Sequence, residues 1–269
     1  MEANWATRLT PEPFRDFLPY TSLSALKVIH VPRVLASALG IVHHFGSESE
    51  RARSAETLAA SLREASIAIA VGQSAPQAPL LGVELTPKSR VAVGKRVLEL
   101  YFHQLHAPGP WFLDLRPRHF AWNEQRQLLT FFPSGLWYEP DADFRRRVQA
   151  LYAGFYRNED AELAQGIELY SWSSRPLAGF SARIEHLLRE HFGPGDASSM
   201  RFSIAHFRET FDRIFREAMQ SRAKLHPDLT FLGVGLVGLY LTLESLQVAL
   251  NPREAYELAA PIRIDPQAA

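Results

Sequence analysis

The sequence predicts a mainly helical protein with a small mixed α+β region near its middle. In most long segments, apolar residues recur at three- and four-residue steps, which is the spacing of one face of an α-helix. Two short β-rich runs, at 120–122 and 128–132, are separated by five polar residues, which is typical of a hairpin. These patterns indicate an α+β fold in which helices dominate.

Length and composition allow one large domain or two small ones in the 269 residues. The 29 basic residues balance 29 acidic ones, so the chain lacks the positive charge typical of nucleic-acid binding. The absence of cysteine excludes disulfides, thiolate nucleophiles and cysteine-ligated metals. The N-terminus does not resemble a secretory signal. The longest uncharged run, 229–243, is shorter than the ~20 residues that span a bilayer, so we expect a cytoplasmic protein without a transmembrane span.

Residues 1–79 are predicted to form a helical N-terminal segment. Helices are expected within 24–46 and over 47–69, and Ser47 is the expected N-cap of the second. The loose stretch at 74–79 then marks a domain boundary or hinge.

Residues 80–262 form the predicted main domain, and 263–269 form a tail. A short apolar strand is expected at 80–85, and an amphipathic helix at 90–106. Proline and glycine end this helix before the apolar run at 111–113.

Beyond the hairpin the pattern is helical throughout. Helices are expected from Asp141 or Asp143 to 155, and at 158–170, 176–191, 203–222 and 226–250. Asn251 and Pro252 are expected to end the last of them. Phe207, Phe211 and Phe215 are expected in the core, and the arginines at 145–147 on a solvated face, with a lipid headgroup contact as the alternative.

One acidic residue after the 90–106 helix is the main candidate for chemistry. Asp114 is followed by Arg116, Pro117 and, five residues on, His119. This order resembles the catalytic loop of a protein kinase, in which the Asp accepts or positions a proton and an Asn five residues later holds magnesium. Asp114 is therefore the candidate base, and Arg116 and His119 are the candidate nucleotide-binding residues. The alternative is an ordinary turn.

Further segments resemble the UbiB/AarF-type atypical kinases. LHPDL at 225–229 is similar to an L-P-x-E-L motif of that family, and Leu243-Glu244 and LNP at 250–252 follow in the family's order. The similarity covers about residues 80–262. It implies a kinase-like C-lobe, and a setting in isoprenoid-quinone or lipid metabolism, often at a membrane surface.

Several features that phosphoryl transfer needs are missing. No glycine-rich loop is present, and AVGQ at 70–73 resembles the family's K-x-G-Q motif with Ala in place of Lys. The N-lobe is therefore expected to be truncated or replaced. No acidic residue lies between Glu124 and Glu139, where the second magnesium ligand belongs, and imidazole is a poor magnesium ligand.

Three hypotheses follow. The leading one is a non-catalytic pseudokinase, without cofactor or metal site, that binds a protein partner or an apolar or lipid ligand in the cytoplasm or peripherally at the inner membrane face. Asp114 would then bond within its own loop or pair with Arg116 or Arg118. The second is a divergent ATPase or small-molecule kinase that uses Asp114 with ATP and a divalent metal. The third is a purely structural protein-interaction module.

Overall fold

The computed structural model describes residues 15–17, 19, 28, 34, 38, 47–62, 65–72, 76, 79–80, 84–192, 195 and 198–260. The helices predicted within 24–46 fall outside these residues apart from three single positions, and the tail at 263–269 lies outside them entirely.

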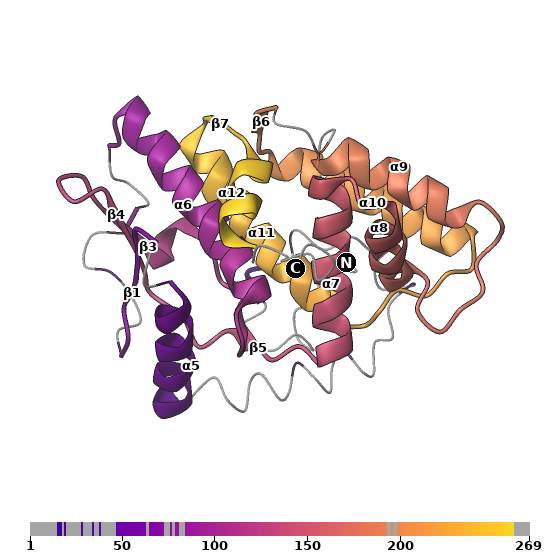
Figure 1. Ribbon diagram of the computed structural model, residues 1–269, viewed down its shortest axis with the longest axis horizontal. Helices are drawn as coiled ribbons and strands as arrows, with labels where there is room; N and C mark the ends of the chain where they lie inside the picture. The colour runs from indigo at the N-terminus through magenta and orange to yellow at the C-terminus, as the bar shows by residue number, and fades with distance from the viewer. Residues whose placement is uncertain are drawn as a thin grey trace, which may run out of the picture.

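The described elements confirm a mainly helical protein with small sheets. In chain order they are α5 (Glu48–Ser61), β1 (Ile67–Ile69), α6 (Pro87–His106), β2 (Trp111–Phe112), η2 (Pro117–His119), β3 (Phe120–Asn123), β4 (Leu128–Phe131), β5 (Trp137–Tyr138), α7 (Ala142–Arg157), α8 (Asp160–Ile167), η3 (Glu168–Tyr170), α9 (Phe180–Phe192), β6 (Met200–Arg201), α10 (Ile204–Gln220), α11 (Leu229–Leu246), β7 (Ala249–Leu250) and α12 (Pro252–Ala259). Figure 1 shows α5 and the sheet of β1, β3 and β4 at one end of the molecule, α8, α9 and α10 toward the other, and α6, α11 and α12 between them.

The helix predicted from residue 47 is shorter than expected. Ser47 does cap α5, because its Oγ accepts the Glu50 N–H at 3.4 Å. The helix ends at Ser61, however, and Ile67–Ile69 form β1, which pairs in parallel with β4. The prediction of a helix to residue 69 was therefore wrong, because a β-branched run gains more from a strand partner than from helical geometry. This pairing also crosses the boundary predicted at 74–79.

The predicted hairpin is confirmed as β3 and β4. The two strands are antiparallel, with Phe120 opposite Phe131. The prediction of a strand at 80–85 was wrong at the three positions that the structure describes, 80, 84 and 85. Leu80 bonds to the Phe120 carbonyl at 2.7 Å, but Leu80, Glu84 and Leu85 are not in a strand, and 81–83 lie outside the described residues.

The long helix α6 begins and ends with side-chain caps. Thr86 caps its start through the Ser89 N–H, at 3.2 Å. At its other end the Arg145 guanidinium donates to backbone carbonyls, including that of Ala107 at 2.7 Å. The last carbonyls of a helix lack partners within the helix, so this arginine satisfies groups that would otherwise be unpaired. The prediction that 145–147 form a solvated face was therefore wrong for Arg145, whereas Arg146 is exposed and pairs with Asp143.

The C-terminal helices follow the predicted order, with one correction. The last long helix, α11, ends at Leu246, and β7 follows it. Asn251 then caps a further helix, α12, because its side chain accepts the N–H groups of Arg253 and Glu254. Asn251-Pro252 was expected only to end a helix. Proline at the first position and asparagine before it are equally a helix start.

Most of α11 lies inside the protein. Among the described residues it is the one helix long and apolar enough to cross a membrane, and 61% of that stretch is buried. Core helices pass the same test, so this is weak evidence for a span. In Figure 1, α11 runs behind α6 and α12.

Candidate functional site

The loop that carries Asp114 is fixed by its neighbours at both ends. The Phe112 N–H donates to the buried Gln104 Oε1 at 3.0 Å, and the Leu113 N–H donates to the Leu136 carbonyl at 2.9 Å. A buried backbone donor without a partner is costly, so these bonds determine where the chain turns. The loop thus has one position relative to α6 and β5.

The helix α11 holds the other side of the loop. A Cβ at Gly238 would lie 2.9 Å from the Leu115 N, which is closer than a side chain allows without movement. One turn further on, the Thr242 hydroxyl donates to the Leu115 carbonyl at 2.5 Å. Glycine at 238 therefore permits a direct approach of the helix to the loop backbone.

The Asp114 carboxylate is buried and surrounded by donors. Its Oδ1 accepts Arg116 Nε at 2.7 Å, and its Oδ2 accepts Nη2 of Arg116 at 2.6 Å and Nη2 of Arg118 at 3.1 Å. The Nε2 of His119 lies 3.0 Å from the same Oδ2. A carboxylate has about four acceptor positions. The predicted pairing of Asp114 with Arg116 or Arg118 is therefore present with both, and little capacity is left for a substrate hydroxyl.

The same contacts make Asp114 a weak base. Burial would raise the pKa of this carboxyl, but hydrogen bonds from Arg116 and His119, together with their charges, outweigh burial and hold the pKa well below its ordinary value. A general base works best when its pKa lies near the working pH. The geometry thus favours a carboxylate that stabilises its loop.

Arg116 connects the loop to the N-terminal segment. Its Nη1 donates to Asp16 at 2.8 Å, and its guanidinium lies 4.6 Å from the centre of the Phe17 ring. The guanidinium is therefore engaged by two carboxylates and an aromatic ring. It is not placed as the free cation that a nucleotide phosphate would need.

The surroundings of Asp114 do not fit a magnesium–nucleotide site. The segment 133–135 is tied to the loop on both sides, because the Phe132 N–H donates to the His119 carbonyl and Leu136 pairs with Leu113. That segment is Pro-Ser-Gly and supplies no carboxylate. The one remaining candidate, His119, has its Nδ1 buried without a hydrogen-bond partner among the described residues, but magnesium prefers oxygen.

A second cluster of possible metal ligands lies where α7 and α11 begin. One ligand atom each from Asp141, His226 and Asp228 lie within 4.8 Å of one another. Asp141 already caps α7 through the Phe144 N–H at 2.7 Å, and His226 Nδ1 accepts the Asp228 N–H at 3.2 Å. The His226 ring also stacks on Phe144. The Asp141 carboxylate and the His226 ring are therefore already used by backbone N–H groups at the two helix starts.

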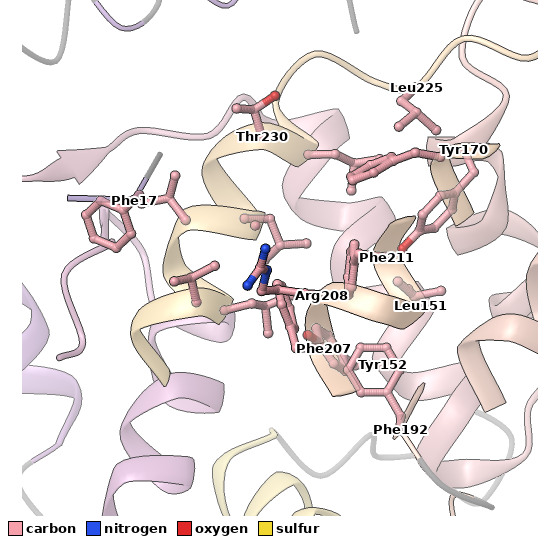
Figure 2. Close-up of a pocket in the computed structure, with 17 residues that line it drawn as sticks. Phe17, Leu151, Tyr152, Tyr170, Phe192, Phe207, Arg208, Phe211, Leu225 and Thr230 are labelled. Atoms are coloured by element: carbon pink, nitrogen blue, oxygen red, sulfur yellow. The ribbon is translucent and has the colours of Figure 1, made fainter. Parts of the chain in front are cut away.

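A pocket of about 120 Å³ opens between α7, α10 and α11. Its walls are almost entirely apolar, and aromatic rings from α7, η3, α9 and α10 gather on one side of it (Figure 2). Residues that define it include Tyr152, Tyr170, Phe207, Phe211, Gly233 and Val237. Apolar concavities with a few polar groups are the usual form of small-molecule sites.

Sequence reasoning did not find this pocket, although its signals were visible. Phe207, Phe211 and Phe215 were expected in the core, and Phe207 is buried there. Phe211 and Phe215 are only partly buried, and all three line the pocket. A helical stripe gives the direction of a face but not whether a neighbouring helix fills the space opposite it.

Comparison of the sequence with protein-family models and with curated proteins gave no match. The candidate site is therefore defined by the geometry of the loop and the pocket.

Proposed function

We propose that this protein is a non-catalytic, kinase-like binding protein, a degenerate relative of the UbiB/AarF type, which holds an apolar ligand in the pocket between α7, α10 and α11. The order of α6, β2, the Asp114 loop, the β3–β4 hairpin and a helical remainder supports the kinase-like part of this proposal. The setting in isoprenoid-quinone or lipid metabolism, with peripheral contact at the inner membrane face, comes from the sequence resemblance alone.

The observation that carries the proposal is the occupied carboxylate of Asp114. Phosphoryl transfer depends on positioning and electrostatic clamps, with a carboxylate directed at the acceptor and a second one at magnesium. Here the first carboxylate is used by Arg116, Arg118 and His119, and the second is missing. The apolar pocket, in contrast, has a form that suits a ligand.

Three measurements on the purified wild-type protein test the proposal. We expect ATP with magnesium or manganese to leave the melting temperature unchanged, since only a ligand of the folded state raises it, and we expect no release of phosphate. We expect 1-octanol, a neutral apolar probe, to shift the methyl NMR signals of Leu232, Val234 and Val237. Metal-dependent ATP turnover that is lost in Asp114→Asn would overturn the non-catalytic proposal in favour of a divergent ATPase or small-molecule kinase. Lack of octanol binding would favour a purely structural module.

A further inference from the structure

Gly233 lies in the pocket wall without a packing reason to be glycine. Among the described residues, no atom lies within 4 Å of a Cβ built at this position, although Gly233 lies inside α11 and lines the pocket. Glycine is unfavourable inside a helix relative to alanine, so glycine at 233 lowers the stability of the helix without relieving a close contact.

The helix α11 has two other glycines, and neither lines the pocket. Gly238 is required by the close approach of the Leu115 backbone, whereas a Cβ at Gly235 would make only an ordinary contact with Leu113 at 3.9 Å. Gly233 differs from both because it lines the pocket. Bare backbone at Gly233 therefore widens the pocket itself, as expected where a ligand lies against a helix.

A solvent-exposed cation also lines the pocket. Arg208 extends from α10 toward α11 among the lining side chains (Figure 2). It makes no hydrogen bond or ion pair with another described residue, although Glu209 and Asp212 are on the same helix. Asp212 pairs instead with Arg216, at 2.9 Å. An unpaired guanidinium beside an apolar pocket is complementary to an anion that has an apolar body.

We propose that the pocket binds a small carboxylate amphiphile, with its apolar group between Phe211 and Gly233 and its carboxylate on Arg208. The volume of about 120 Å³ is close to the ~150 Å³ of an apolar cavity that accepts benzene, so it holds a ring or a short alkyl group while any longer chain extends outward. A single guanidinium matches a carboxylate in charge and bidentate geometry, whereas a phosphate monoester would keep uncompensated charge. This inference rests on the proposed binding function and adds the chemistry of the ligand.

Three probes of equal chain length test the charge. Octanoate, 1-octanol and octylammonium are titrated into methyl-labelled wild-type protein, with shifts of the Val234 and Val237 signals as the readout. We expect octanoate to bind about five- to tenfold more tightly than octanol, because a charge-assisted hydrogen bond adds to the same apolar contact. Octylammonium is expected to bind most weakly. Octyl phosphate is the fourth probe, and its binding more tightly than octanoate would overturn the assignment of a carboxylate.

Two variants locate the contacts. Arg208→Gln should remove the preference for octanoate and leave octanol binding unchanged, whereas Arg216→Gln on the same helix should change neither. Gly233→Leu should fill the pocket and abolish binding of all probes without lowering the melting temperature, because its side chain enters open space. Gly235→Ala is the matched control, since it improves the helix away from the pocket.

The outcomes separate this inference from the proposed function. Equal binding of octanoate and octanol, blocked by Gly233→Leu, would overturn the carboxylate assignment and leave the binding function standing. A preference for octanoate that survives Arg208→Gln would overturn the role of Arg208. Absence of binding by every probe would overturn both the ligand and the binding function.

Discussion

Replacing Asp114 by asparagine tests whether this residue stabilises the fold. The substitution preserves the shape of the side chain but removes the negative charge that faces Arg116. The side chain of Arg116 is itself mostly buried. Removing one member of a buried ion pair costs about 3–5 kcal/mol, because the other charge stays buried. Arg116 keeps its contact with Asp16, and asparagine can still accept one hydrogen bond. We therefore expect the free energy of unfolding of Asp114→Asn to fall by about 2–3 kcal/mol at pH 7.

The pH dependence of stability provides a second, independent check. The pKa of Asp114 is lowered in the folded state, so its contribution is complete above the unfolded pKa of about 3.9 and is lost as the pH falls toward the folded pKa. The wild type should therefore lose stability more steeply than Asp114→Asn below about pH 4, and the difference between the two proteins should shrink. Urea unfolding at pH 7, 4 and 3 measures both effects.

The control for this experiment is Asp143→Asn. Asp143 also faces two arginines, Arg146 and Arg147, but its side chain is half exposed. Exposed ion pairs contribute little, so we expect a loss below about 1 kcal/mol. If Asp114→Asn is as stable as the wild type, or more stable, the reasoning is refuted. Asp114 would then be a residue retained for activity at a cost in stability, as catalytic residues often are.

Three further substitutions test the contacts around the loop and the C-terminal helix. Gly238→Ala should lower the free energy of unfolding in urea by about 1–3 kcal/mol, because the new Cβ would clash with the Leu115 backbone. Gly235→Ala should not lower this free energy. Thr242→Val should lose about 1–2 kcal/mol by the same assay, because it leaves the buried Leu115 carbonyl without its hydroxyl donor, and an unchanged stability would contradict the importance of this bond. Asn251→Ala should cost about 1 kcal/mol and speed hydrogen exchange in α12, and unchanged exchange there would show that the cap is dispensable.

The sequence predicts most helices because their signals are local. The helices α7 and α10 each combine an apolar stripe with a capping side chain, Asp141 and Ser203, directly before the first turn. The strand β1 has no such signal, since the strand it pairs with, β4, lies about sixty residues further along the chain. Arg145 was misjudged for the same reason. Its role depends on where the end of α6 lies in space.

In the candidate site, too, contacts between nearby residues could be predicted and contacts between distant residues could not. Asp114, Arg116 and His119 are within six residues of one another, so their contact could be anticipated from spacing. The ion pair between Asp16 and Arg116 could not be anticipated, because the two residues are one hundred positions apart in the sequence. The pocket requires three helices to be placed together. Sequence periodicity predicted which face of α10 is apolar, but not that a pocket lies between this face and α11.

The helix α11 connects the two candidate sites. Its Gly238 and Thr242 hold the Asp114 loop, and one turn or more before them Gly233 leaves space in the pocket. If α11 served only for packing, alanine at 233 would increase the stability of the protein. Alanine at 238 would instead place its Cβ against the Leu115 backbone and lower the stability. Opposite effects of alanine at these two positions would therefore show that the fold requires glycine at 238 but not at 233. Equal losses at both would mean that Gly233 is packed after all, and the pocket would lose its strongest support.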